Sequence, residues 1–206
     1  MRAVVVYESM FGNTHHVASA IGDGIAEVMA VTALNVSDAT AALIEGAELV
    51  VVGGPTHVHG MSLPRTRDQA QKMAADSAGE LHLDDDASGI GVREWLESLP
   101  AAHAMAAAFD TRTNIPRGLS GAACGRIDRA LRRRGLRVVA TPMSFLVDAS
   151  NQLEPSELAR ARAWGIDIAH EAMSIDTADT TGRSVETTRH GSPGEAPTNL
   201  FLVHAP

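Results

Sequence analysis

The stretch that decides the fold is Arg2-Ala-Val-Val-Val-Tyr7 followed by Glu8-Ser9-Met10-Phe11-Gly12-Asn13-Thr14. The first six residues form an apolar run with the length of a buried strand, and the next seven form a loop of mostly small and hydroxyl-bearing residues. Beyond the loop, a stripe at helical spacing predicts a helix from Thr14 to Met29: Val17, Ile21, Gly24, Ile25 and Val28. A strand, a loop and a helix N-terminus in this order form the geometry that binds a phosphate.

The loop carries the chemistry for a phosphate without a cation. The side-chain oxygens of Ser9, Asn13 and Thr14, together with backbone N–H groups of the loop and the first helical turn, can surround a dianionic ester. Neither the Gly-Lys-Ser/Thr of a Walker site nor the Gly-x-Gly-x-x-Gly of a dinucleotide site occurs at this turn. The loop therefore predicts a phosphomonoester site, and a capped helix without a ligand is the alternative.

Composition favours a single α/β domain. The 206 residues are 45% hydrophobic and 20% charged, which is enough for a substantial core. The net charge of −8 argues against nucleic acid as the main partner, and no apolar stretch is long enough to span a membrane. The single cysteine, Cys124, excludes an internal disulfide and a cysteine-based metal site. We expect no metal, and a cytoplasmic location because the N-terminus begins with a strand instead of a signal-like segment.

Apolar runs alternate with helical patterns along the chain, as in a parallel sheet covered on both faces. The predicted strands are 2–7, 31–36, 48–53, 104–109 and 136–141, with continuation of the last to 147 left open, and the predicted helices are 14–29, 38–44, 92–99, 119–134 and 155–172. We interpret residues 65–91 as a surface insertion within a domain of residues 1–173. Residues 174–206 are predicted to be disordered or loosely docked.

Two further loops follow predicted strand ends. They are Gly53-Gly54-Pro55-Thr56-His57-Val58-His59-Gly60-Met61 and Asp110-Thr111-Arg112-Thr113-Asn114. In an open parallel sheet, ligands bind beyond the carboxyl ends of the strands where the winding direction reverses. We therefore expect all three loops to meet at one crevice.

On these residues the sequence resembles the flavodoxin family, which is itself the standard example of this rule, with FMN bound at the crevice. Glu8 to Thr14 is similar to the family's phosphate-binding loop, and Gly53 to Thr56 resembles its second loop, which flavodoxin-like quinone reductases share. The resemblance implies a doubly wound five-stranded parallel sheet in the order 2-1-3-4-5, with FMN as cofactor. The implied FMN-binding residues are Ser9, Met10, Phe11, Gly12, Asn13, Thr14, Pro55, Thr56, His57, Val58, His59, Phe109, Asp110, Thr111 and Arg112.

The ring-binding loops depart from the family pattern, since classical flavodoxins place aromatic side chains against the flavin. This chain is only 3% aromatic, and its second loop offers His57 and His59 while its third loop has no Trp or Tyr. An imidazole stacks with less area than an indole, so we expect weaker FMN binding and a more exposed ring. Alternatively, both histidines are solvated loop residues.

Charge at two places has competing interpretations. Arg112 at the N1 and O2 edge of the ring would favour the anionic reduced flavin and raise the second reduction potential. Alternatively, it pairs with Asp110 at the surface.

Six arginines cluster on and after the helix predicted at 119–134: Arg126, Arg129, Arg132, Arg133, Arg134 and Arg137. We interpret them as a solvated face that complements the helix dipole, in preference to a docking surface.

Three functions fit these observations. The first is an FMN electron carrier that serves a redox partner protein, and the second is an FMN-dependent NAD(P)H:quinone-type oxidoreductase. The third is a binding or regulatory module that kept the fold without redox activity. We assign no catalytic acid or base, because the cofactor would carry the electrons.

Overall fold

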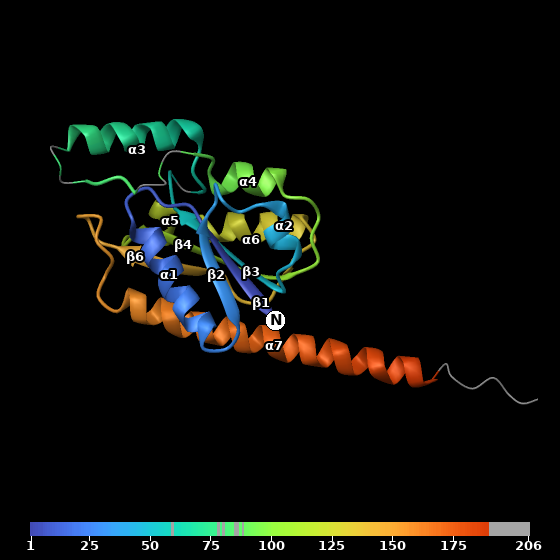
Figure 1. Ribbon diagram of the computed structural model, residues 1–206. Coiled ribbons are helices and arrows are strands. Elements are labelled where there is room, and N and C mark those ends of the chain that lie inside the picture. Colours follow the sequence, from blue (N-terminus) through green and yellow to red (C-terminus); the bar gives the residue numbers. More distant parts are fainter. Residues whose placement is uncertain (59, 78, 80, 85–86, 88, 190–206) are drawn as a thin grey trace, which may run out of the picture. The chain divides into compact units, whose positions relative to one another are not determined.

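The computed structural model describes residues 1–58, 60–77, 79, 81–84, 87 and 89–189. The chain divides into two compact units, Met1–Met173 and Ser174–Pro206. The first unit contains the sheet and the candidate site (Figure 1). No helix in the described ranges is both long enough and apolar enough to cross a membrane.

The sheet of the first unit is parallel and has the predicted order β2-β1-β3-β4-β5, which confirms the flavodoxin-like topology. Its strands are β1 (Arg2–Tyr7), β2 (Ala30–Asn35), β3 (Leu49–Pro55), β4 (Met105–Thr113), β5 (Arg137–Val138) and β6 (Met143–Val147). The predicted fifth strand is divided in two, because β5 pairs with the start of β4 and β6 pairs with its end. Pro142, which has no N–H to donate, lies between them.

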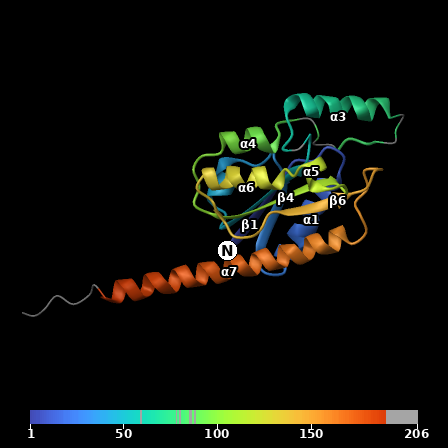
Figure 2. The same ribbon diagram turned by 180° about the vertical axis from the view of Figure 1, so that it is seen from behind.

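Helices cover both faces of the sheet (Figures 1 and 2). One face carries α1 (Asn13–Ala26) and residues 157–173 of α7 (Glu157–Arg189), and the other carries α2 (Ala41–Glu45), α4 (Val92–Ser98) and α6 (Cys124–Arg133). The short α5 (Arg117–Ser120) follows β4. Alternate strand residues such as Val4 and Val6 belong to the core cluster that includes Trp95 and Ile127. The hydrophobic side chains of β1 therefore serve two separate core layers.

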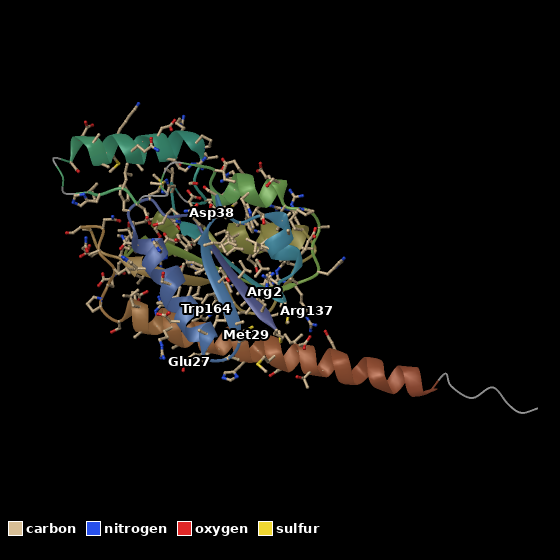
Figure 3. All side chains as sticks on the ribbon, in the orientation of Figure 1. Arg2, Glu27, Met29, Asp38, Arg137 and Trp164 are labelled. Carbon is tan, nitrogen blue, oxygen red and sulfur yellow. The ribbon has the colours of Figure 1, made fainter. Side chains whose placement is uncertain are left out.

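The α1 and α7 face is closely packed. A Cβ atom on Gly24 of α1 would collide with the carbonyl of Arg162, and one on Gly165 of α7 would collide with the carbonyl of Ile21. Glycine at both positions lets the two backbones touch. Trp164 of α7 lies between these helices and the sheet (Figure 3), with its ring centroid 6.5 Å from that of Phe109.

Two helices extend beyond the predicted elements. The segment interpreted as a surface insertion contains helix α3 (Pro64–Asp76), which was not predicted, and the predicted end of the last helix at Ala172 is wrong because α7 continues to Arg189. A start signal for α3 was present, because Pro64 occupies its first turn and the Thr66 hydroxyl accepts the Leu63 N–H at 2.9 Å. Residues 174–189 contain no proline that would end the helix. Residues 190–206 of the predicted tail lie outside the described part of the chain.

Candidate functional site

The first loop ends in a helix N-terminus with open donors. Gly12 stands at the N-cap of α1 with φ 85°, a conformation that L side chains rarely adopt. Its N–H donates to Ser9 Oγ at 3.1 Å, which closes the loop. No side chain caps the helix, so the N–H groups of its first turn remain available to a ligand.

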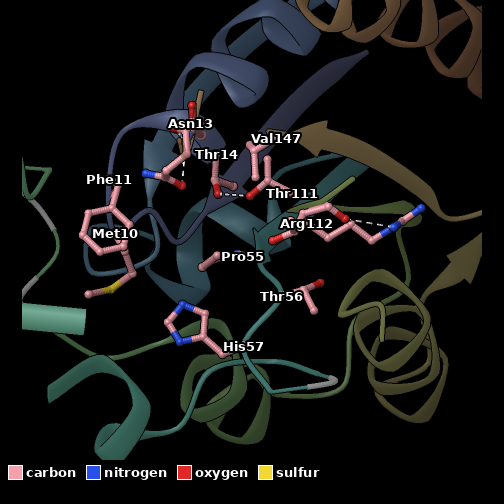
Figure 4. A pocket seen from close by; sticks show the side chains of 12 residues that line it. Met10, Phe11, Asn13, Thr14, Pro55, Thr56, His57, Thr111, Arg112 and Val147 are labelled. Atoms are coloured by element: carbon pink, nitrogen blue, oxygen red, sulfur yellow. Dashed lines mark hydrogen bonds between the residues drawn. The ribbon is translucent and has the colours of Figure 1, made fainter. Parts of the chain in front are cut away.

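Two buried hydroxyl groups add donors at the same place. Thr14, which is 2% exposed, has its Oγ1 atom 2.7 Å from the Oγ1 atom of Thr111 on β4 (Figure 4). In such a pair one hydroxyl donates to the other, and the second proton is left for a third oxygen. Ser9 is also buried, and its hydroxyl accepts from Gly12 and keeps its own proton. The loop thus offers backbone and hydroxyl donors without a cation.

The side chain of Asn13 joins the first loop to a segment that the sequence analysis missed. Its Nδ2 atom donates to the carbonyl of Asn151 at 2.8 Å and to Asn151 Oδ1 at 3.2 Å. The amide group therefore orients the loop against the segment after β6. Asn151, Val147 and Thr113 all line the pocket. The rule that sites lie at carboxyl strand ends would have included Asn151, because polar residues follow the apolar run that ends at Val147.

The segment after α3 covers the first loop from outside. Met10 is 2% exposed and forms a small apolar cluster with Ala70 of α3 and with Ala87. The N–H of Asp84 donates to the Met10 carbonyl at 2.9 Å. The predicted insertion therefore shields the first loop.

The second loop makes a tight turn beyond β3. The N–H of His57 donates to the carbonyl of Gly60 at 2.8 Å, and the N–H of Gly60 donates back to His57 at 2.9 Å. Val58 in this turn has φ 40°, as two-residue turns of this kind require, and is 79% exposed. Burial lowers the pKa of His57, with a smaller effect of the Arg67 charge, so its imidazole is neutral at pH 7. His59 lies outside the described residues.

The predicted boundary of the third loop is wrong by four residues, since β4 continues to Thr113. Phe109 and Asp110 are therefore inside the strand and completely buried. Phe109 packs against Phe145, with ring centroids 6.2 Å apart, and it occupies the space beside Gly53. The polar sequence after Phe109 suggested a loop, but the Asp110 carboxylate has partners inside the fold.

Asp110 lies beneath the second loop. Its Oδ2 atom accepts the Thr56 hydroxyl at 3.0 Å and the N–H of Cys124 at 2.9 Å. The Thr56 hydroxyl in turn accepts the N–H of Ala123 at 2.9 Å. These bonds join the second loop, β4 and the start of α6. Burial, followed by the Asp110 charge, raises the pKa of Cys124 to about 11, so its thiol is protonated at neutral pH.

Arg112 lines the pocket, but its guanidinium group is bound to its own loop. Nη1 donates to the carbonyls of Thr113 at 3.2 Å and Ile115 at 2.9 Å and lies 3.3 Å from Ser120 Oγ. The alternative pairing with Asp110 does not occur, because Asp110 accepts from Thr56 and Cys124 instead. The charge of Arg112 therefore stays fixed beside the pocket.

Glu8 ends β1 next to the first loop and is only 4% exposed. Its Oε2 atom accepts the N–H of Val92 at 2.8 Å. Burial raises the pKa of Glu8 in spite of the nearby Arg67. Arg67 itself donates to Glu94 Oε2 at 3.1 Å and to Ser62 Oγ at 2.9 Å.

These segments enclose a pocket of about 130 Å³ at the carboxyl end of the sheet (Figure 4). It is lined by Met10, Phe11, Asn13, Thr14, Pro55, Thr56, His57, Thr111, Arg112, Thr113, Val147 and Asn151. The other predicted residues that the structure describes lie outside this lining: Ser9, Gly12, Val58, Phe109 and Asp110. Across the described ranges, no group of three His, Cys, Asp or Glu side chains could hold a metal.

Comparison with solved structures supports the fold. A flavodoxin from the domain Archaea is 24% identical with a TM-score of 0.58, and the match covers 84% of this chain and 99% of that one. Flavodoxin 1 from Bacillus cereus is 20% identical with a TM-score of 0.56, over 84% of this chain and 98% of the other. The Flv1 flavodiiron core from Synechocystis sp. PCC6803 is 19% identical with a TM-score of 0.56, over 85% of this chain and 36% of that one.

Sequence comparison identifies the family. No curated protein matches the chain. The model of the family described as Flavodoxin matches residues 5–111, which is more than half of the sequence. This range includes the first and second loops and β4 up to Thr111. The chain therefore belongs to the flavodoxin family.

Proposed function

We propose that the protein binds FMN in this pocket and acts as an electron carrier. The observation that carries the proposal is the uncapped N-terminus of α1, where the N–H groups of the first turn and the hydroxyl groups of Ser9 and Thr14 are available as donors beside the pocket. A phosphomonoester dianion needs several such donors, and a helix N-terminus favours its charge. The donor set therefore fits the phosphate of FMN.

The remaining pocket residues would hold the ring. Pro55 to His57 come from the second loop, and Arg112 and Thr113 come from the end of β4. Phe11, which comes from the first loop, lines the pocket with its phenyl ring. When bound, FMN supplies one- and two-electron chemistry, while the protein binds it, orients it and limits its contact with water. The neutral imidazole of His57 adds no fixed charge beside the ring.

A carrier needs a redox partner protein, whereas a quinone reductase needs NAD(P)H and a quinone. The absence of an assigned catalytic acid or base is compatible with both activities, because the cofactor would carry the electrons. We favour the carrier, since the second loop leaves Val58 exposed next to the pocket residue His57, where another protein could contact it. A cytoplasmic location remains a prediction.

The decisive experiment is titration of the apo protein with FMN, followed by absorption and fluorescence. Saturable binding is expected, together with weaker binding of riboflavin, which lacks the phosphate. No binding of FMN at tens of micromolar would contradict the proposal, since this corresponds to less than about 6 kcal/mol of binding free energy. Steady NAD(P)H consumption in the presence of a quinone would show that the protein is a quinone reductase instead of an electron carrier.

A further inference from the structure

One segment of this acidic chain is strongly basic. Residues 117–137 contain seven arginines and a single acidic residue, Asp128, although the whole chain carries a net charge of −8. The exposed members on α5 and α6 form what we call the arginine face: Arg117, Arg126, Arg129, Arg132 and Arg133. Positive charge is thus concentrated on one surface of a negatively charged molecule.

The helix dipole accounts for only part of this face. Arg132 and Arg133 occupy the last turn of α6, where cations are favourable. Arg126 lies in the first turn, where the dipole disfavours a cation. Arg126 and Arg133 form no hydrogen bond or ion pair with the described residues, so their guanidinium groups remain open to a partner. The position of Arg126 therefore calls for an explanation other than helix stability.

The arginine face is continuous with the candidate site. Arg126 Nε would lie 2.6 Å from a Cβ atom on Gly60, so this arginine contacts the second loop directly. A groove of about 310 Å³ between α4 and α6 is lined by Arg93, Arg133 and Arg134, together with Glu97 and with Met61 of the second loop. The basic surface therefore begins at the turn that borders the pocket.

Exposed apolar side chains occur in the second loop and in the segment after β4 that leads to α5. Val58 is 79% exposed in the second loop, and Ile115 and Leu119 are 43% and 67% exposed just after β4. Leu119 is on α5 beside Arg117. Apolar side chains next to guanidinium groups are typical of a protein interface, in which arginine is enriched.

From this arrangement we propose that the arginine face is the docking surface for an acidic redox protein, which exchanges electrons at the adjacent pocket. The inference rests on the proposed function for the electron exchange, but the binding of an acidic surface does not require the cofactor. Charge complementarity would steer the partner to this basic surface of a chain whose net charge is −8.

The first test measures binding of a fluorescent decaglutamate peptide to the full chain without FMN, at low salt. Arg126→Glu is expected to weaken binding at least about tenfold. The matched control is Arg162→Glu, which changes the net charge equally but lies on α7, where Arg162 pairs with Glu27 at 2.9 Å. Glu27 is the C-cap residue of α1, and α1 lies on the face of the sheet opposite α6 (Figure 1). The control is expected to change binding by less than about twofold.

Two results of this test would overturn the proposal. Equal losses for Arg126→Glu and Arg162→Glu would mean that the peptide senses net charge alone. Binding of a decathymidylate more than about tenfold tighter than that of the peptide would make nucleic acid the preferred occupant. A folded but non-binding Arg133→Glu variant, checked by circular dichroism, would support the proposal independently of Arg126.

The second test uses the FMN-loaded protein and small oxidants. Hexacyanoferrate(III) and hexaammineruthenium(III) each accept one electron, so two ions oxidise one fully reduced flavin. For the anionic oxidant the rate is expected to fall about tenfold as salt rises, whereas a uniformly negative surface would make it rise. A rising rate would overturn the proposal. If FMN does not bind, the peptide test still decides whether the arginine face binds an acidic partner.

Discussion

The two ends of the pocket are built differently. At the end formed by the first loop, Gly12 is held by Ser9, and Thr14 is held by Thr111 in a buried setting. At the other end, the second loop exposes Val58, and the lining consists of Pro55, Thr56 and a neutral His57. The hydrogen-bond donors that are fixed by the fold are therefore concentrated at the end where a phosphate would bind. Most of the affinity should therefore come from the phosphate end, and contact with a partner from the ring end.

The largest expected effect is the loss of a phosphate donor. Thr14→Val should weaken FMN binding about 100-fold, because it removes a hydrogen bond to a charged group and leaves the buried Thr111 hydroxyl without its partner. The matched control is Thr113→Val at the ring end, with an expected change below about threefold. Fluorescence titration of both variants measures the difference, and similar losses would refute the contrast between the two ends.

Gly12→Ala tests whether the loop conformation matters at the same end. A Cβ atom would find room, since its nearest neighbour is His16 Cε1 at 3.7 Å, but φ 85° costs an alanine about 1–2 kcal/mol. FMN binding should weaken about tenfold. Gly118→Ala is the control, because its Cβ atom would meet nothing within 4 Å and no positive φ is involved. Unchanged binding in Gly12→Ala would show that the loop adapts to the ligand.

Glu8, beside the phosphate end, predicts one pH dependence of stability. Burial raises its pKa above 4.5, so the folded state binds the proton more tightly than the unfolded state. Its contribution is fully present below pH 4.5 and is lost as pH rises through the folded pKa. Compared with Glu8→Gln, the wild type should lose stability over this window in urea unfolding. Parallel pH profiles for the two proteins would exclude a buried, titrating carboxyl group.

His57, at the ring end, predicts the opposite slope. Burial lowers its pKa below 6.5, so the unfolded state binds the proton more tightly. Its contribution is present above pH 6.5 and is lost as pH falls through the folded pKa. His57→Gln should flatten the decrease in melting temperature between pH 7.5 and pH 5.5. If the variant keeps the full decrease, other groups cause it.

Arg112 should have the smallest effect. Its guanidinium group is bound to the carbonyls of Thr113 and Ile115, so its charge is fixed near the pocket and partly neutralised by these dipoles. In the FMN-loaded protein, Arg112→Gln should lower the second reduction potential slightly, because a positive charge that favours the reduced anion is removed. A redox titration measures the shift, and a rise in this potential would contradict the assigned direction.

The sequence predicted the local structure around the first loop better than that around the third loop. Strand β1 has the predicted bounds, and the following loop leads into α1 as its spacing indicated. At the ring end, Asp110 suggested a loop because buried carboxylates are rare in strands, and its partners Thr56 and Cys124 come from distant parts of the chain. Such long-range satisfaction of a polar group cannot be derived from local pattern.

Asn151 and α3 were missed for different reasons. Asn151 enters the pocket through its contact with Asn13, which is 138 positions away in the sequence. Helix α3 has few apolar residues, and only Arg67 and Ala70 are buried in it, so periodicity gave no signal. The start signal at Pro64 would have been enough to suggest a helix there.

The direct contact between α1 and α7 has a consequence for the order in which the protein is made. The apolar stripe of α1, including Ile21, is covered by residues that are synthesised about 140 positions later, around Gly165. At a synthesis rate of about 5–20 residues per second, roughly 7 to 30 seconds pass between the synthesis of this stripe and the synthesis of the residues that cover it. A nascent chain therefore exposes this stripe of α1 until the residues around Gly165 have been synthesised.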